Sequence, residues 1–175
     1  VDLGNPPTGG GASSAGVSSG TIDGFGSIFV NGIEYETDDA EIIVKGQDHP
    51  WVSRGGVKLA HALEAFAIDV TGTVAIDVGS STGGFTDVLL AGGAAKVYAV
   101  DSGTNQLAWK LRADDRVIVH EKTSARILTE QHITERVDLI VCDASFISLS
   151  KVLERPLSFA KVGAQLVALI KPQFE

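Results

Sequence analysis

The chain has 175 residues, 44% of them hydrophobic, and a formal net charge of −8 at pH 7. Such a chain can bury the core of about one domain. Its apolar runs are far shorter than the roughly 18 residues of a transmembrane helix, which argues against a membrane-spanning protein. Its single cysteine excludes a disulfide framework, so we expect a protein of a reducing compartment, the cytoplasm.

Acidic residues are concentrated near the N-terminus. Residues 1–48 hold eight acidic residues and one basic residue, whereas residues 49–175 hold fourteen acidic and thirteen basic residues. Binding to nucleic-acid phosphates depends on Lys and Arg, so a nucleic-acid contact in the C-terminal region would have to be a local patch. The side chains available for such a patch are Arg54, Lys58, Lys110, Arg112 and Lys171.

The first 48 residues divide into two parts. Residues 1–20 consist mostly of Gly, Ser, Pro, Ala and Thr, a composition that cannot offset the entropy of ordering, and we expect a flexible tail. Residues 21–48 predict a small β element. Its expected parts are strands at 27–30 and 33–35, joined by an Asn31-Gly32 hairpin turn, and a strand at 41–44.

Helical and strand patterns alternate over residues 49–175, which predicts an α/β fold with a parallel sheet. The expected strands are 74–78, 97–100, 117–120, 139–142 and 166–170, and the expected helices include 56–66, 85–91 and 105–112. Trp109 is expected in the core, with stacking on a nucleic-acid base as the alternative. The four histidines lack the spacing of metal ligands, so no metal site is predicted.

A glycine-rich turn follows the first of these strands: Asp77-Val-Gly-Ser-Ser-Thr-Gly-Gly84. Ligands of open α/β sheets bind beyond the carboxyl ends of the strands, and glycines let the backbone approach them closely. Asp77 could accept hydrogen bonds from a cationic amino group, and Asp101, which ends the next strand, could accept both hydroxyls of a ribose. The glycine spacing differs from the dinucleotide fingerprint, and the lysine of the phosphate loop is missing, which argues against a nicotinamide oxidoreductase. The alternative is a tight connection without a ligand.

Five segments carry a more specific pattern than the turn alone. They are Trp51-Val-Ser-Arg-Gly-Gly-Val-Lys58, the turn extended to Asp87, Val100-Asp101 with Asn105 to Arg112, Cys142-Asp143-Ala-Ser-Phe-Ile-Ser148, and Lys171-Pro-Gln-Phe-Glu175. In order and spacing they resemble the TlyA family of hemolysin-named rRNA methyltransferases, which are FtsJ-like. The resemblance implies a Rossmann-like domain over 49–175 that uses S-adenosylmethionine to methylate the ribose 2'-hydroxyl of cytidines in ribosomal RNA, with rRNA or a ribosomal subunit as its partner.

The resemblance also implies the site residues. The family's catalytic pattern is Lys-Asp-Lys-Glu, and its first three positions match Lys58, Asp143 and Lys171. Lys171, at the end of a buried strand, is the better candidate to accept the proton of the ribose hydroxyl. If each residue is considered alone, the alternatives are that Lys58 is a solvated helix residue, Asp143 caps the end of a strand, and Lys171 is a snorkelling lysine. The expected cofactor contacts are Asp77, Gly79, Ser80, Ser81, Gly83, Gly84, Phe85 and Asp101, and the expected RNA contacts are Arg54, Lys58, Lys110 and Arg112. Phe85 could instead be a core residue that does not contact the cofactor.

The sequence departs from the family pattern at both ends. The fourth catalytic residue and the last strands of the family's sheet are expected beyond residue 175, and Glu175 belongs to its own segment rather than to the catalytic pattern. We therefore expect a truncated, incomplete sheet of about five strands with an exposed edge at 166–170. Family members begin with an S4-type RNA-binding domain, whereas residues 21–48 resemble only the end of one, or an OB-like repeat, so RNA affinity should be weak.

Two functions stay open. One is rRNA methyl transfer by a truncated catalytic core. The other is a non-catalytic module that binds RNA or the cofactor, which the missing glutamate and strands favour. A membrane-active hemolysin is not supported, because the sequence has neither a basic amphipathic helix nor a spanning segment. The sequence does not indicate an oligomeric state.

Overall fold

The computed structural model describes residues 28–30, 33–35 and 49–175. The chain divides into two compact units, residues 1–46 and residues 47–175. Among the helices in the described part of the chain, none combines the length and the apolar character needed to cross a membrane.

A short hairpin is the described part of the first unit. Strand β1 (Ile28–Val30) pairs antiparallel with β2 (Ile33–Tyr35), in agreement with the predicted hairpin. The predicted tail at 1–20 and the predicted strand at 41–44 lie outside the described residues.

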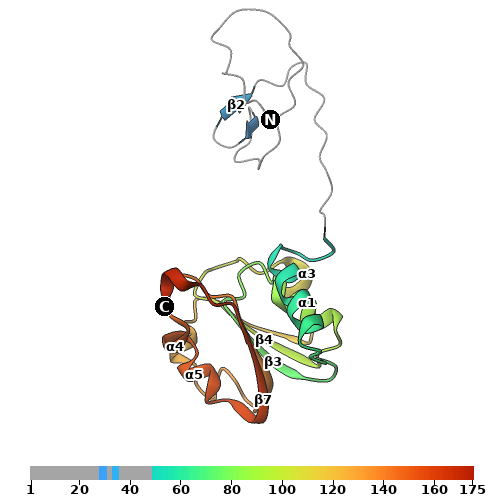
Figure 1. Ribbon diagram of the computed structural model, residues 1–175, viewed down its shortest axis with the longest axis vertical. Coiled ribbons are helices and arrows are strands. Elements are labelled where there is room, and N and C mark those ends of the chain that lie inside the picture. Colours follow the sequence, from blue (N-terminus) through green and yellow to red (C-terminus); the bar gives the residue numbers. More distant parts are fainter. Residues whose placement is uncertain (1–27, 31–32, 36–48) are drawn as a thin grey trace, which may run out of the picture. The chain divides into compact units, whose positions relative to one another are not determined.

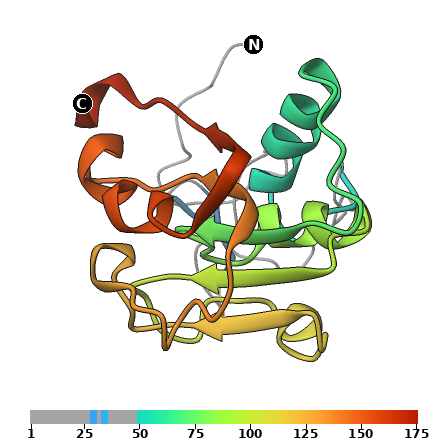
Figure 2. The same ribbon diagram turned by 90° about the horizontal axis from the view of Figure 1, so that it is seen from below.

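A five-stranded parallel sheet forms the second unit and confirms the predicted α/β architecture (Figure 1). Its strands are β3 (Val74–Val78), β4 (Lys96–Val100), β5 (Val117–His120), β6 (Val137–Cys142) and β7 (Ala160–Ala168), in the order β5-β4-β3-β6-β7. Figure 2 shows β4 and β5 side by side and running in the same direction. The chain moves outward from β3 to β5 and then returns to the other side of β3. This reversal places the switch point of the sheet, where ligands bind in such folds, between the carboxyl ends of β3 and β6.

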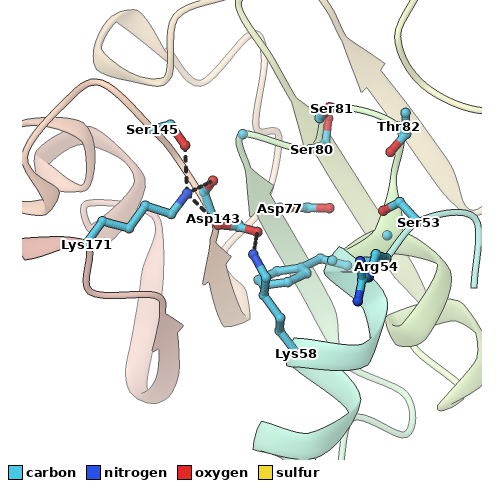
Figure 3. Close-up of a pocket in the computed structure, with 14 residues that line it drawn as sticks. Ser53, Arg54, Lys58, Asp77, Ser80, Ser81, Thr82, Asp143, Ser145 and Lys171 are labelled. Carbon is cyan, nitrogen blue, oxygen red and sulfur yellow. Dashed lines mark hydrogen bonds and ion pairs between the residues drawn. The ribbon is translucent and has the colours of Figure 1, made fainter. Parts of the chain in front are cut away.

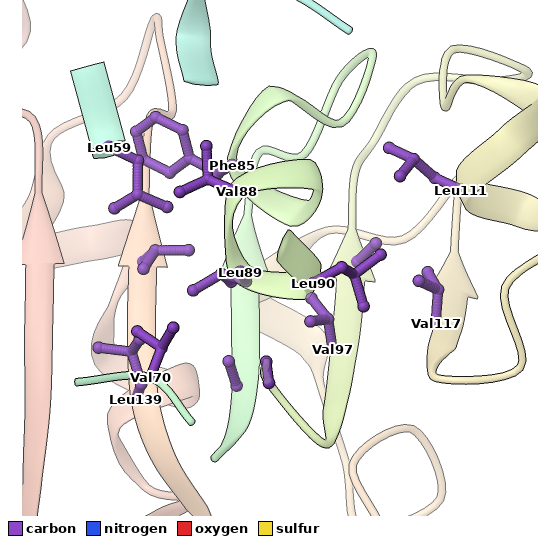
Figure 4. Close-up of a cluster of buried hydrophobic side chains, with 14 of the residues drawn as sticks. Leu59, Val70, Phe85, Val88, Leu89, Leu90, Val97, Leu111, Val117 and Leu139 are labelled. Carbon is purple, nitrogen blue, oxygen red and sulfur yellow. The ribbon is translucent and has the colours of Figure 1, made fainter. Parts of the chain in front are cut away.

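Helices cover both faces of this sheet. They are α1 (Gly55–Ala65), α2 (Gly84–Ala91), α3 (Trp109–Arg112), α4 (Leu149–Val152) and α5 (Glu154–Leu157), with 3₁₀ turns η1 (Ala125–Ile127) and η2 (Pro172–Phe174). On one face Leu59 and Leu89 pack with strand residues such as Val97 (Figure 4). On the other face Ile76 packs with Val152. Both faces are thus buried, as parallel strands require.

The predicted helix at 105–112 is wrong in its first half, because α3 covers only the last four of these residues. The backbone N–H groups of Asn105, Gln106 and Leu107 donate to the Glu121 carboxylate at 2.8, 2.9 and 3.2 Å. Asn105 also has a φ of 52°, outside the right-handed helical region. A carboxylate from another segment therefore satisfies N–H groups that a longer helix would have used.

Trp109 lies on the surface of α3, with 81% of the residue exposed. The expected core position of this side chain is therefore wrong. Leu107 and Leu111 are buried instead, and they direct the segment toward the sheet. Base stacking by Trp109 stays a prediction.

The last strand, β7, covers 160–168 rather than the predicted 166–170. Its pairing with β6 is irregular, since Val137 pairs with Ala160 but Leu139 pairs with Gln165. β7 is the outermost strand on its side of the sheet, and the Val162 side chain is fully exposed. The predicted exposed edge is thus confirmed within the described residues, although it begins earlier in the sequence.

Candidate active site

The bend after β3 brings the backbone to the switch point of the sheet. Gly79 and Gly83 have φ values of 79° and 95°, which favour glycine. A Cβ atom on Gly83 would also lie 2.3 Å from Leu111 Cδ1. The N–H groups of Gly79 and Ser80 donate to the carbonyl of Val100 at 2.9 and 3.1 Å, so the bend is fastened to the end of β4.

Asp77 lies buried beneath this bend, with 1% of the residue exposed. Its Oδ2 accepts hydrogen bonds from the N–H and the hydroxyl of Thr86 at 3.0 and 2.7 Å, whereas its buried Oδ1 has no hydrogen-bond partner among the described residues. Burial raises the pKa of the Asp77 carboxyl to about 7, and the charges of Asp101 and Asp143 add to this, while the Thr86 bonds oppose it. An unsatisfied buried oxygen costs free energy, so Asp77 suits a ligand that brings a cation or an N–H donor.

Asp101 connects the loop after β4 to the bend. Its Oδ2 accepts a hydrogen bond from the Ser81 N–H at 2.8 Å, and its Oδ1 accepts one from the Gly103 N–H at 2.6 Å. Each oxygen of a carboxylate can accept two hydrogen bonds. Asp101 therefore keeps the capacity to accept further hydroxyl donors at the end of β4, as the predicted ribose contact requires.

Three of the predicted residues meet in a lysine-aspartate cluster: Lys58, Asp143 and Lys171 (Figure 3). Lys58 Nζ lies 3.1 Å from Asp143 Oδ2, and Lys171 Nζ lies 2.7 Å from Asp143 Oδ1. Lys58 comes from α1, Asp143 directly follows β6, and Lys171 follows β7. The fold therefore brings together all three predicted catalytic residues.

The orientation of Lys58 depends on a close contact between the first turns of α1 and α2. A Cβ atom on Gly84 would lie 2.3 Å from Ser53 Oγ and 2.7 Å from the backbone nitrogen of Gly56. The N–H of Val52 also donates to Asp87 Oδ2 on α2 at 2.9 Å. These contacts hold the start of α1 against the bend, so Lys58 faces the end of β6.

Two adjoining clefts, of about 350 and 570 Å³, open at this edge of the sheet. The smaller cleft contains the lysine-aspartate cluster, Asp77, Arg54 and an edge of the buried Phe85. The larger cleft extends along Asp101 toward η1. The residues common to both are Gly79, Ser81, Asp143 and Ser145. Asp143 therefore lies at the junction of the two clefts.

The four predicted RNA contacts separate into two pairs. Arg54 and Lys58 line the smaller cleft, and Arg54 has no ion-pair partner among the described residues. Lys110 is ion-paired with Asp87 at 3.0 Å, and Arg112 is ion-paired with Glu121. In this arrangement Lys110 and Arg112 fasten α3 to its neighbours, and their contact with RNA stays a prediction.

Sequence reasoning missed two residues of the site and its surroundings. Glu121 holds the loop before α3, and the bond from Arg112, followed by the backbone N–H groups of that loop, lowers the pKa of its carboxyl to about 2 despite burial. Ser145 hydrogen-bonds to Lys171. Its position within the segment Cys142 to Ser148 was the available signal. Within the described residues, no group of three His, Cys, Asp or Glu side chains could hold a metal ion.

Known proteins resemble this chain in sequence and in fold. A family model described as FtsJ-like methyltransferase matches residues 51–175. The chain is 56% identical over 133 residues to the 16S/23S rRNA (cytidine-2'-O)-methyltransferase TlyA of Mycobacterium tuberculosis. This match covers 76% of this chain and 50% of that protein. It is 42% identical over 161 residues to hemolysin A of Brachyspira hyodysenteriae, and this match covers 86% of this chain and 65% of that protein.

A solved structure is also similar to this chain. The structure of a candidate hemolysin from Streptococcus thermophilus matches with a TM-score of 0.72 at 49% identity, covering 75% of this chain and 48% of that chain. The chain spans about half the length of the first curated relatives it matches.

Proposed function

The chain belongs to the FtsJ-like methyltransferase family, and from that premise we propose that its second unit transfers a methyl group from S-adenosylmethionine to the ribose 2'-hydroxyl of cytidines in ribosomal RNA. The observation that carries this proposal is the position of Asp143, whose carboxylate bridges Lys58 and Lys171 at the junction of two clefts. The relatives named as rRNA (cytidine-2'-O)-methyltransferases support the choice of substrate.

The residues of the bend fit the proposed methyl donor. The unsatisfied Oδ1 of Asp77 suits the donor's cationic amino group, and Asp101 at the end of β4 suits its ribose hydroxyls. The left-handed Gly79 lets the chain pass close to Ala144, since a Cβ atom there would lie 3.2 Å from Ala144 Cα. We therefore assign the donor to the bend from Asp77 to Gly84 and to Asp101, with Gly79, Ser80, Ser81, Gly84 and Phe85 lining the clefts. Gly83, also predicted as a cofactor contact, lines neither cleft and faces Leu107 and Leu111. When bound, S-adenosylmethionine supplies an electrophilic methyl group.

The lysine-aspartate cluster acts on the acceptor hydroxyl. A ribose hydroxyl is a weak nucleophile, and transfer requires its oxygen to be aligned with the methyl carbon. Two lysine ammonium groups and one carboxylate give the cluster a net positive charge, which stabilises negative charge that develops on the hydroxyl oxygen as its proton passes to solvent water in the cleft. Lys58 has one partner, Asp143, among the described residues, so its remaining N–H groups can donate to that oxygen. Arg54, in the same cleft, can contact an RNA phosphate.

Methyl transfer to ribosomal subunits tests the proposal. Purified chain, radiolabelled S-adenosylmethionine and subunits that lack the modification should give label in rRNA, and Lys171→Ala should reduce the rate at least about a hundredfold. Lys151→Ala is the matched control, because Lys151 is exposed on α4 and has no ion pair among the described residues. Equal rates for the two variants would contradict the proposed role of the cluster.

Calorimetry separates catalysis from binding alone. We expect S-adenosylmethionine and its demethylated product to bind the chain, with affinity reduced by Asp101→Ala because a ribose acceptor is lost. Binding without any methyl transfer would identify a non-catalytic cofactor-binding module. A folded sample that binds neither compound would exclude both functions.

A further inference from the structure

The amine of Lys171 has three oxygen neighbours (Figure 3). Its Nζ lies 2.7 Å from Asp143 Oδ1, 2.7 Å from Ser145 Oγ and 3.1 Å from the main-chain oxygen of Asp143. An ammonium group has three N–H donors and no acceptor. Ser145 Oγ and the main-chain oxygen of Asp143 accept hydrogen bonds from this ammonium, whereas Asp143 Oδ1 makes an ion pair and has no hydrogen-bond partner among the described residues. Lys58, in contrast, has one hydrogen-bonded oxygen neighbour among the described residues, Asp143 Oδ2.

We propose that Ser145 is a positioning residue whose hydroxyl fixes the direction of the Lys171 ammonium at the junction of the two clefts. The importance of this positioning for catalysis rests on the methyl transfer proposed above. Asp143 does not suffice to fix this direction, because its carboxylate is shared between two amines and a lysine amine sits on a flexible four-carbon chain. A second acceptor on a separate residue removes the remaining rotation.

The backbone that carries Ser145 is held firmly. The next residue, Phe146, has a φ of 65°, which a bulky side chain rarely adopts and which persists only where the surroundings stabilise it. The ring of Phe146 lies 5.3 Å from that of Phe174, centroid to centroid. The Leu149 N–H donates to Glu175 Oε1 at 3.0 Å. The segments that follow β6 and β7 are thus joined at two further points, which keeps Ser145 and Lys171 in register.

The hydroxyl of Ser145 has a donor left over. Its oxygen accepts the hydrogen bond from Lys171, so its own proton can be donated to another group. Ser145 lines both clefts. The same hydroxyl therefore links the position of Lys171 to whatever oxygen a ligand places at the junction.

Competitive labelling of lysines tests this role without requiring catalysis. The full chain is treated with trace acetic anhydride at a fixed pH, and mass spectrometry after digestion gives the labelling ratio of Lys171 to Lys58. We expect Ser145→Ala to raise this ratio roughly fivefold to tenfold, since one hydrogen bond to the ammonium is lost. Ser145→Thr retains the hydroxyl and should leave the ratio near that of the unchanged chain.

A matched serine controls for general loosening. Ser150→Ala removes a hydroxyl that contacts Ser148 at 2.6 Å and forms no hydrogen bond with Lys171, so the ratio should not change. If Ser145→Ala does not fold, as judged by circular dichroism, Ser145→Cys provides a weaker acceptor of similar size with the same expected direction. A ratio unchanged by Ser145→Ala or Ser145→Cys, or raised equally by Ser145→Thr, would overturn the proposal.

The catalytic consequence is measured separately. In the methyl-transfer assay Ser145→Ala should lower kcat about tenfold with little change in the KM for S-adenosylmethionine, and Ser145→Thr should restore kcat. If the unchanged chain transfers no methyl group, the proposed function fails in this chain. The labelling ratio still decides whether Ser145 positions Lys171.

Discussion

Asp143 and Lys171 form an ion pair across the carboxyl ends of two neighbouring parallel strands, with Asp143 Oδ1 lying 2.7 Å from Lys171 Nζ. Asp143 directly follows β6, and Lys171 lies shortly after the end of β7. The pairing of these strands therefore creates the contact. Because the other oxygen of Asp143 faces Lys58, one carboxylate determines the arrangement of two amines.

Removing the charge of Asp143 should affect the reaction more than cofactor binding. Asp143→Asn keeps the size of the side chain but leaves two ammonium groups without their shared counter-charge, so we expect methyl transfer to fall about a hundredfold to a thousandfold. Affinity for S-adenosylmethionine, measured by calorimetry, should change by less than about tenfold. Asp115→Asn is the control, because Asp115 is exposed and has no ion pair among the described residues. Similar transfer rates for the two variants would show that the bridge is unimportant.

The buried carboxyl of Asp77 should make stability depend on pH. Its pKa of about 7 lies above the ordinary value of 3.8, so between about pH 4 and pH 7 the folded state binds more protons than the unfolded state at this group. The contribution of Asp77 to the free energy of unfolding is therefore largest below pH 4 and is lost as the pH rises through 7. Asp77→Asn should gain stability relative to the unchanged chain over this window, by up to about 4 kcal/mol.

Urea denaturation at several pH values between 4 and 8 measures this difference. Asp69→Asn is the control, since hydrogen bonds from Thr71 lower the pKa of the exposed Asp69 carboxyl from 3.8. Asp69 is then largely ionised in the folded and the unfolded state over this pH range, so the stability difference between Asp69→Asn and the unchanged chain should vary little with pH. A difference between Asp77→Asn and the unchanged chain that stays constant with pH would contradict the raised pKa of Asp77.

The same carboxyl should couple cofactor binding to proton release. A cationic amino group beside Asp77 Oδ1 favours the charged carboxylate, so binding of S-adenosylmethionine near pH 6 should release a proton and affinity should rise as the pH approaches 7. Calorimetry in two buffers of different ionisation enthalpy counts the protons released. We expect a smaller number for Asp77→Asn. The same count for both proteins would place the amino group elsewhere.

Glu121 should stabilise the fold through the loop that it holds. Its pKa is lowered to about 2, first by the bond from Arg112 and then by the loop N–H groups, so its stabilising contribution is present above about pH 4.5 and is lost as the pH falls toward 2. Glu121→Gln should lower the free energy of unfolding at pH 7 by about 2 kcal/mol, with a smaller effect at pH 3. Glu130→Gln, at an exposed carboxylate 3.9 Å from Arg155, should cost less than about 0.5 kcal/mol. Equal effects of the two variants in urea denaturation would rule out the loop-holding role.

The elements that sequence could predict are those defined by local patterns. The central strands are buried on both faces and therefore appear as continuous apolar runs, and the bend from Asp77 to Gly84 has a recognisable glycine spacing. The contacts that it could not predict join distant segments. The Glu121 carboxylate accepts hydrogen bonds from backbone N–H groups 14 to 16 residues earlier, where a helical turn was expected. Ser145 accepts a hydrogen bond from Lys171, 26 residues later. The first half of β7 was missed because Lys161, Val162 and Gln165 are exposed at the edge and show no buried apolar pattern.

Gly83 should be the least replaceable residue of the bend, because backbone conformation and space both oppose a side chain there. Its φ of 95° disfavours any residue with a Cβ atom, and that atom would lie 2.3 Å from Leu111 Cδ1 and 2.8 Å from Leu107 Cδ1. Gly72 offers a matched control, since its φ is 72° but nothing lies within 4 Å of a Cβ atom. Gly72→Ala should therefore cost only the conformational term of about 1 kcal/mol, whereas Gly83→Ala should cost a further 1–3 kcal/mol or so from crowding.

Urea denaturation of the two glycine variants separates these terms, and calorimetry with S-adenosylmethionine adds a second comparison. Displacement of the bend by Gly83→Ala should weaken cofactor binding, because the N–H groups at the start of α2 follow directly on Gly83. Gly72, like Gly83, lines neither cleft, but it does not precede α2, so Gly72→Ala should leave the affinity unchanged. Equal losses of stability in the two variants would mean that Leu107 and Leu111 repack at no cost, and that backbone conformation alone requires glycine at position 83.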